Sequence, residues 1–130
     1  MNPFRAALRY ARARSAWLGS GGNPVPQPLA NARATVCLSC PKNQPHPLYE
    51  NLAAPIAAML RRQIELKANM KLAVPDEARL HLCEACWCVM ALKVWEPLEH
   101  AVPSTPLADL QRANPVCWIL EETALADKPK

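Results

Sequence analysis

The chain has 130 residues, which suits one small domain, and its 14 prolines divide it into short segments. The net charge of +4 is uneven, because residues 1–49 hold six basic and no acidic side chains, whereas residues 50–130 sum to −2. No apolar run approaches the roughly 20 residues of a membrane-spanning helix, and the arginine-rich start lacks the apolar centre of a signal peptide. We therefore expect neither a membrane span nor secretion, but a reducing compartment.

The first 28 residues are predicted to form an arm. Residues 3–18 have the apolar spacing of a helix, four glycine and serine residues end it, and residues 23–28 favour an extended, polyproline-like strap. The basic helix suits an anionic or acidic partner. The residues expected to contact this partner are Arg5, Arg9, Arg12 and Trp17.

The middle of the chain favours short helices joined by loops. Residues 29–36 are predicted to form a helix that leads into the first cysteine pair. Residues 49–70 are predicted to form the longest helix. Pro55 is expected to start the main part of this helix, because proline suits a first turn. The expected fold is mainly α: a small, irregular, metal-stapled domain with an extended N-terminal helix-plus-proline arm.

The last third of the chain is less regular. Residues 74–77 and 104–112 have the features of short helices, while residues 89–95 fit either a strand or a helix. Residues 121–130 are polar and are expected to fray. The predicted division is an arm over 1–28, a cysteine-cluster metal-binding domain over 29–120 and a tail over 121–130.

Cysteine spacing is the most informative feature of the sequence. The six cysteines are Cys37, Cys40, Cys83, Cys86, Cys88 and Cys117. Two of the spacings are CxxC, and two residues between cysteines allow a tight turn to direct both thiolates at one point. We expect Cys37, Cys40, Cys83 and Cys86 to be the first ligands of a tetrathiolate site, with Cys88 and Cys117 as further candidates. Structural zinc supplies on the order of 10 kcal/mol of folding free energy to small domains.

Several alternatives stay open for this site. Cys88 and Cys117 could replace a first ligand, pack as small apolar groups, or belong to a binuclear centre. The metal is expected to be Zn²⁺, with a [4Fe–4S] cluster as the alternative, because four thiolates hold either one. Lys42 and Lys93 are placed to offset the negative charge of a tetrathiolate metal centre. Backbone N–H groups of the cysteine turns are expected to donate to the sulfurs.

Other side chains near the cysteines have simpler interpretations. Trp87, Trp95 and Trp118 are expected to surround the metal and form a small core rather than stack on bases. His81 is expected to be a surface or second-sphere histidine, because cysteine already supplies enough ligands.

The motifs CLSCPKN, CEACWCVMALKVW and VCW together resemble a family of small cysteine-cluster proteins from tailed phages and prophages. The resemblance covers roughly residues 29–120, and Trp87 stands where that family usually has glycine. It implies a phage gene product and a virion component. Some phage tail-tip proteins carry iron–sulfur clusters, which is a reason to keep that alternative.

No catalytic motif emerges, since no serine lies in a nucleophile elbow and the glycine run lacks the lysine of a phosphate loop. The predicted function is a non-enzymatic structural or assembly component of a phage particle, at the tail or its tip, in the virion or host cytoplasm. The arm would bind other virion proteins. The alternatives are a zinc-dependent nucleic-acid-binding module whose basic arm contacts phosphates, and an iron–sulfur redox or sensor protein.

Overall fold

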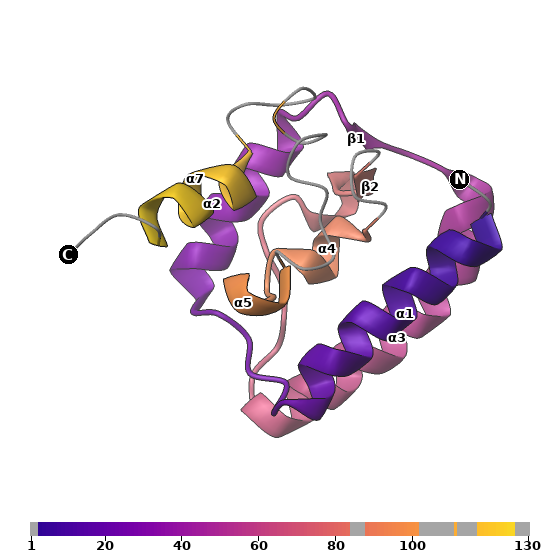
Figure 1. Ribbon diagram of the computed structural model, residues 1–130, viewed down its shortest axis with the longest axis horizontal. Coiled ribbons are helices and arrows are strands. Elements are labelled where there is room, and N and C mark those ends of the chain that lie inside the picture. The colour runs from indigo at the N-terminus through magenta and orange to yellow at the C-terminus, as the bar shows by residue number, and fades with distance from the viewer. Residues whose placement is uncertain (1–2, 84–87, 102–110, 112–116, 127–130) are drawn as a thin grey trace.

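The protein is mainly helical in a computed structural model that describes residues 3–83, 88–101, 111 and 117–126 (Figure 1). In chain order the elements are α1 (Pro3–Gly19), α2 (Gln27–Leu38), β1 (Asn43–Gln44), α3 (Pro47–Ala68), η1 (Glu77–Arg79), β2 (Leu82–Cys83), α4 (Met90–Lys93), α5 (Leu98–Ala101) and α7 (Trp118–Ala126). None of the helices in these ranges is long and apolar enough to cross a membrane.

Two long helices, α1 and α3, lie side by side and form one flank of the molecule (Figure 1). The helical prediction for residues 3–18 is confirmed, but the expectation that this segment extends away from the body is wrong. Trp17 is 1% exposed and belongs to the same core as Leu60 and Ile64 of α3. Burial of this indole and of apolar α3 side chains holds α1 against α3.

Two glycines with positive φ, Gly21 at +124° and Gly22 at +63°, follow the end of α1. Gly22 has φ +63° and its N–H donates to the Trp17 carbonyl at 3.1 Å, which closes the helix with a left-handed residue. A Cβ at Gly22 would lie 3.1 Å from Leu18 Cδ1 and 3.6 Å from Ile64 Cγ1. The small residue therefore permits both the turn and the close approach of α1 to α3.

Helix α3 runs through Pro55 instead of starting there, so that part of the prediction is wrong. Proline removes one helical N–H, but Pro55 and Asn51, whose carbonyl loses its donor, are both exposed, so water can satisfy that carbonyl. Asn69 ends the helix in the left-handed region, with its N–H bonded to the Glu65 carbonyl.

The body opposite this pair contains α2, α4, α5, α7 and the β1–β2 ribbon (Figure 1). The two strands are antiparallel, with Asn43 opposite Cys83 and Gln44 opposite Leu82. The core continues into this body through Leu72, Leu92, Trp95, Trp118 and Ile119.

Helix α2 confirms the short helix predicted over 29–36, and η1 forms just after the start predicted at 74–77. The ambiguous segment 89–95 contains a four-residue helix, α4. The tail prediction is partly wrong, because residues 121–126 belong to α7. Of the helix predicted over 104–112, residue 111 is helical and the rest lies outside the described residues.

Candidate metal centre

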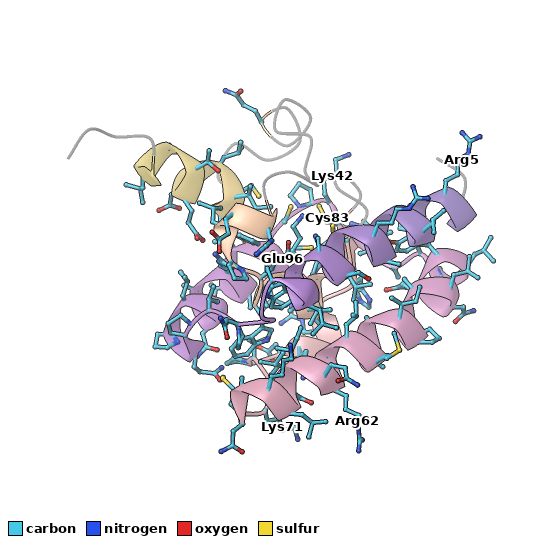
Figure 2. The ribbon with its side chains drawn as sticks, turned by 60° about the horizontal axis from the view of Figure 1, so that its bottom comes forward. Arg5, Lys42, Arg62, Lys71, Cys83 and Glu96 are labelled. Carbon is cyan, nitrogen blue, oxygen red and sulfur yellow. The ribbon has the colours of Figure 1, made fainter. Side chains whose placement is uncertain are left out.

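The β1–β2 ribbon brings the first cysteine turn beside the second cysteine cluster. The Cys40 N–H donates to the Cys37 carbonyl at 3.1 Å, and the Asn43 N–H donates to the Cys40 carbonyl at 3.1 Å, so the chain turns tightly around this pair. Asn43 then pairs with Cys83 across the ribbon. Cα atoms of such opposed residues lie about 4.5 to 5.5 Å apart, so two cysteine-bearing turns distant in sequence meet here. Figure 2 shows Lys42 and Cys83 in the same region.

The two sulfurs of the first turn each accept an N–H donor. The backbone N–H of Lys42 points at Cys40 Sγ at 3.4 Å, as predicted for the turn. The indole Nε1–H of Trp118 donates to Cys37 Sγ at 3.3 Å across 81 residues of sequence. Donors of this kind stabilise negative charge on sulfur and fix its orientation. Cys37 is buried and Cys40 is partly exposed.

Two cationic side chains lie beside the sulfur of Cys88. Lys93 Nζ lies 3.3 Å from Cys88 Sγ, as expected for a lysine that offsets thiolate charge. Arg14 Nη1 of α1 lies 3.6 Å from the same sulfur. All three side chains are buried.

Cys117 immediately precedes α7, where helix N–H groups have no partner within the helix. Burial raises the pKa of the Cys117 thiol, while N–H groups of Ile119 and Leu120 oppose the rise. A charged Cys40 raises the pKa further and Lys93 lowers it. Trp118, the residue after Cys117, donates to Cys37 Sγ, so the third cysteine segment lies near the first.

The aromatic and histidine predictions can be compared with their positions. Trp95 and Trp118 are 0% and 3% exposed, which confirms their placement in the core, while Trp87 lies outside the described residues. His81 is 39% exposed, and its Nδ1 lies 3.6 Å from Glu50 Oε1. It therefore occupies the surface, as expected.

The structure does not assemble a complete ligand set. Within the described ranges, no group of three or more His, Cys, Asp or Glu side chains is arranged to hold a metal ion. Cys86, predicted as a first ligand, lies outside those ranges. The five cysteines that the structure does describe are all free of disulfide bonds. The donor chemistry suits a thiophilic metal, since buried or half-buried sulfurs from separate segments receive N–H donors.

A buried ion pair beside Cys88 escaped the sequence analysis. Arg14 Nε lies 2.7 Å from Glu96 Oε2, and Arg14 Nη2 lies 3.0 Å from Glu96 Oε1, with both side chains 0% exposed. Figure 2 shows Glu96 inside the molecule behind α1. Burial raises the pKa of Glu96 to about 7, although the charges of Arg14 and Lys93 oppose this rise. Arg14 has no distinguishing signal in a sequence where arginines recur throughout the first helix.

Arg33 of α2 is a second buried cation whose burial the sequence pattern did not indicate. It donates to the carbonyls of Val94 at 3.0 Å and Glu96 at 2.6 Å, and its other nitrogens reach the Glu122 carboxylate at 2.6 and 2.8 Å. Its guanidinium also lies 4.1 Å from the centroid of the Trp118 ring. Arg33 of α2 thus contacts both the segment that follows α4 and helix α7. It also packs on the Trp118 indole that donates to Cys37.

The predicted partner-binding residues occupy different environments. Arg5 and Arg12 are exposed on α1, and Arg5 projects outward in Figure 2. The Arg9 side chain lies outside what the structure describes. Trp17 is a core residue whose Nε1–H donates to the Asn23 carbonyl at 3.0 Å, so its predicted role as a partner anchor is wrong.

Comparisons with family models, with curated proteins and with solved structures gave no match.

Proposed function

We propose that the protein is a non-enzymatic structural or assembly protein whose body is held together by a metal bound to cysteine thiolates. Zn²⁺ is the leading metal, and a [4Fe–4S] cluster is the alternative. One observation carries the proposal: N–H donors from separate elements point at the sulfurs of Cys37, Cys40 and Cys88, which lie on segments that pair at or beside the β1–β2 ribbon.

The donors favour sulfurs that carry negative charge. A neutral thiol is a weak acceptor, whereas a hydrogen bond to an ionised acceptor is about twice as strong. The indole of Trp118 and the backbone N–H of Lys42 are arranged as outer-sphere donors to metal-bound thiolates would be. A redox thiol pair is a weaker interpretation, because such pairs belong to a βαβ context and the described strands form a two-stranded ribbon.

The short elements of the body supply a second argument. Strands of two residues and helices of four cannot form stably by themselves, because their ordering entropy exceeds what their few hydrogen bonds return. A metal that joins the first cysteine turn to the later cysteine segments would close long loops and hold these elements in place.

The resemblance to phage cysteine-cluster proteins supplies the proposed setting, a virion component at the tail or tail tip. The exposed arginines Arg5 and Arg12 of α1 are the residues proposed to face a partner subunit. A nucleic-acid-binding role has less support, because Arg14 is buried in an ion pair and does not contribute to a basic surface. Nucleic acid binding would also have to weaken steeply with salt.

Metal analysis of anaerobically purified protein tests the proposal. We expect about one zinc per chain, or iron and sulfide in equal amounts, and the Cys40→Ser variant should retain markedly less metal than wild type. Ser39→Ala is the matched control, because this exposed serine lies in the same turn. A folded, colourless wild-type protein with no bound metal would contradict the proposal.

The proposed setting has its own test. Quantitative mass spectrometry of purified phage particles should recover the chain at a fixed copy number if it is a virion component. Its recovery only from the lysate, free of particles, would exclude this role and leave the metal centre unaffected.

A further inference from the structure

Cys88 lies beside Cys83 of strand β2. The Cys83 N–H donates to the Cys88 carbonyl at 3.1 Å, and Leu82 forms a β-bridge with Val89. The two cysteines that bound residues 84–87 are therefore held next to each other by the backbone. Cys88 is 3% exposed, so water has little access to its sulfur.

Two buried cations are directed at this sulfur from opposite parts of the sequence. Lys93 follows Cys88 by five residues and approaches to 3.3 Å, whereas Arg14 is 74 residues away in α1 and approaches to 3.6 Å. Both cationic side chains are 0% exposed. The arrangement does not result from local chain geometry alone, because α1 must pack on the body to deliver Arg14.

The cations beside Cys88 favour negative charge on its sulfur. Of the four buried charged residues in the described part of the chain, Arg33 pairs with the Glu122 carboxylate, so Arg14 and Lys93 are the cations near Cys88 and Glu96 is the buried acid. Removing a lysine from water costs several kcal/mol unless a negative group is nearby. A zinc ion with four thiolates carries a net charge of −2, which Lys93 and Arg14 would offset in part, because Arg14 also pairs with Glu96.

We propose that Cys88 is one of the thiolate ligands of the metal centre and that Lys93 and Arg14 offset part of the negative charge of that centre. This assignment rests on the proposed metal centre and selects one ligand from the candidates. It opposes the view that Cys88 is merely a small buried apolar side chain, because such a residue would not be paired with a buried ammonium group. It also gives α1 a direct connection to the metal centre through Arg14.

Cobalt substitution tests the ligand assignment. The metal-free protein is titrated with Co²⁺, and the thiolate-to-metal charge-transfer absorption per bound ion reports how many sulfurs coordinate. We expect Cys88→Ser to lower this absorption relative to wild type at saturating Co²⁺. Unchanged intensity in this variant would overturn the assignment.

Lys93→Met provides the second test, because methionine keeps most of the apolar stem and removes the charge. Loss of an outer-sphere partner commonly weakens metal binding 10- to 100-fold, so competition against a zinc chelator should show about this decrease. Lys71→Met is the control, since Lys71 is exposed and projects outward at the end of the helix pair (Figure 2). Equal zinc affinity of Lys93→Met and Lys71→Met would overturn the role of Lys93.

The two proposals fail differently. If wild type binds neither Zn²⁺ nor Co²⁺, the metal centre and the assignment of Cys88 both fall. If wild type binds metal while the Cys88 and Lys93 variants behave like wild type, the metal centre stands and this inference falls. Cobalt absorption is measured per bound ion at saturation, so lower stability of a variant does not imitate its loss. Zinc affinities are compared at conditions where both metal-free lysine variants are equally folded, because metal binding and folding are coupled.

Discussion

The α1–α3 pair and the cysteine-bearing body are held together by different means. In the helix pair, long helices bury apolar side chains such as Trp17 and Ile64 against each other. In the body, short elements surround buried charges and sulfurs, and Arg33 alone joins three segments. Long helices can be specified by local propensity and an apolar stripe, whereas the body requires contacts between residues far apart in sequence.

Arg14 connects these two regions, and its loss should give the largest effect. Arg14→Met leaves the Glu96 carboxylate buried without its partner, which costs about 3 to 5 kcal/mol. Urea denaturation should show this loss, while Arg12→Met, an exposed neighbour on the same helix, should change stability by no more than about 0.5 kcal/mol. A loss below about 1 kcal/mol for Arg14→Met would mean that the ion pair does not fasten α1 to the body.

The stability of the α1–α3 pair should depend on buried apolar side chains and not on buried charges. Ile64→Ala removes a fully buried side chain of α3 and should lower the free energy of unfolding by about 2 to 5 kcal/mol. Leu66→Ala on the same helix is the control, because Leu66 is 67% exposed and its truncation should have little effect. Similar losses for both variants would show that the outer face of α3 is also packed in solution.

The pH dependence of stability distinguishes the body from the helix pair. Burial raises the pKa of Glu96 from 4.5 to about 7, so the folded state binds the proton more tightly than the unfolded state. Stability from this group is fully present below pH 4.5 and declines as pH rises to about 7, by no more than about 3 kcal/mol. The charges of Arg14, Lys93, Cys88 and His100 act on this carboxyl, and none of these four side chains is changed in a Glu96→Gln variant.

Denaturation of wild type and Glu96→Gln across this pH range isolates that contribution, because titrations common to both proteins cancel in the difference. We expect wild type to lose stability relative to the variant between about pH 4.5 and pH 7. A difference that is constant with pH would place the folded-state pKa of Glu96 near its ordinary value.

The smallest expected change is a gain in the helix pair. Pro55 lies inside α3 on an exposed face, where proline removes a helical hydrogen bond. Pro55→Ala should raise the free energy of unfolding by about 1 to 3 kcal/mol, which thermal denaturation followed by circular dichroism would detect. A decrease would indicate that the proline is needed where it stands.

The long helices were predictable because their signals are local. Apolar spacing identified α1 and α3, and the cysteine pairs indicated which turns meet at the ribbon. The packing of α1 was not predictable, because Trp17 and Arg14 resemble an exposed basic helix until their partners are known. The burial of Arg33 and Glu96 depends on contacts 61 to 89 residues apart, which no local pattern contains.

The contact between Arg14 and Glu96 spans 82 residues and has a consequence for biosynthesis. When the ribosome has made α1, the carboxylate and the sulfur that Arg14 contacts have not yet been translated. The face of α1 that bears Arg14 therefore stays exposed, or bound to a chaperone, until Glu96 has left the ribosome. Nascent chains that stop before residue 96 should consequently be more prone to aggregation and proteolysis than the finished protein.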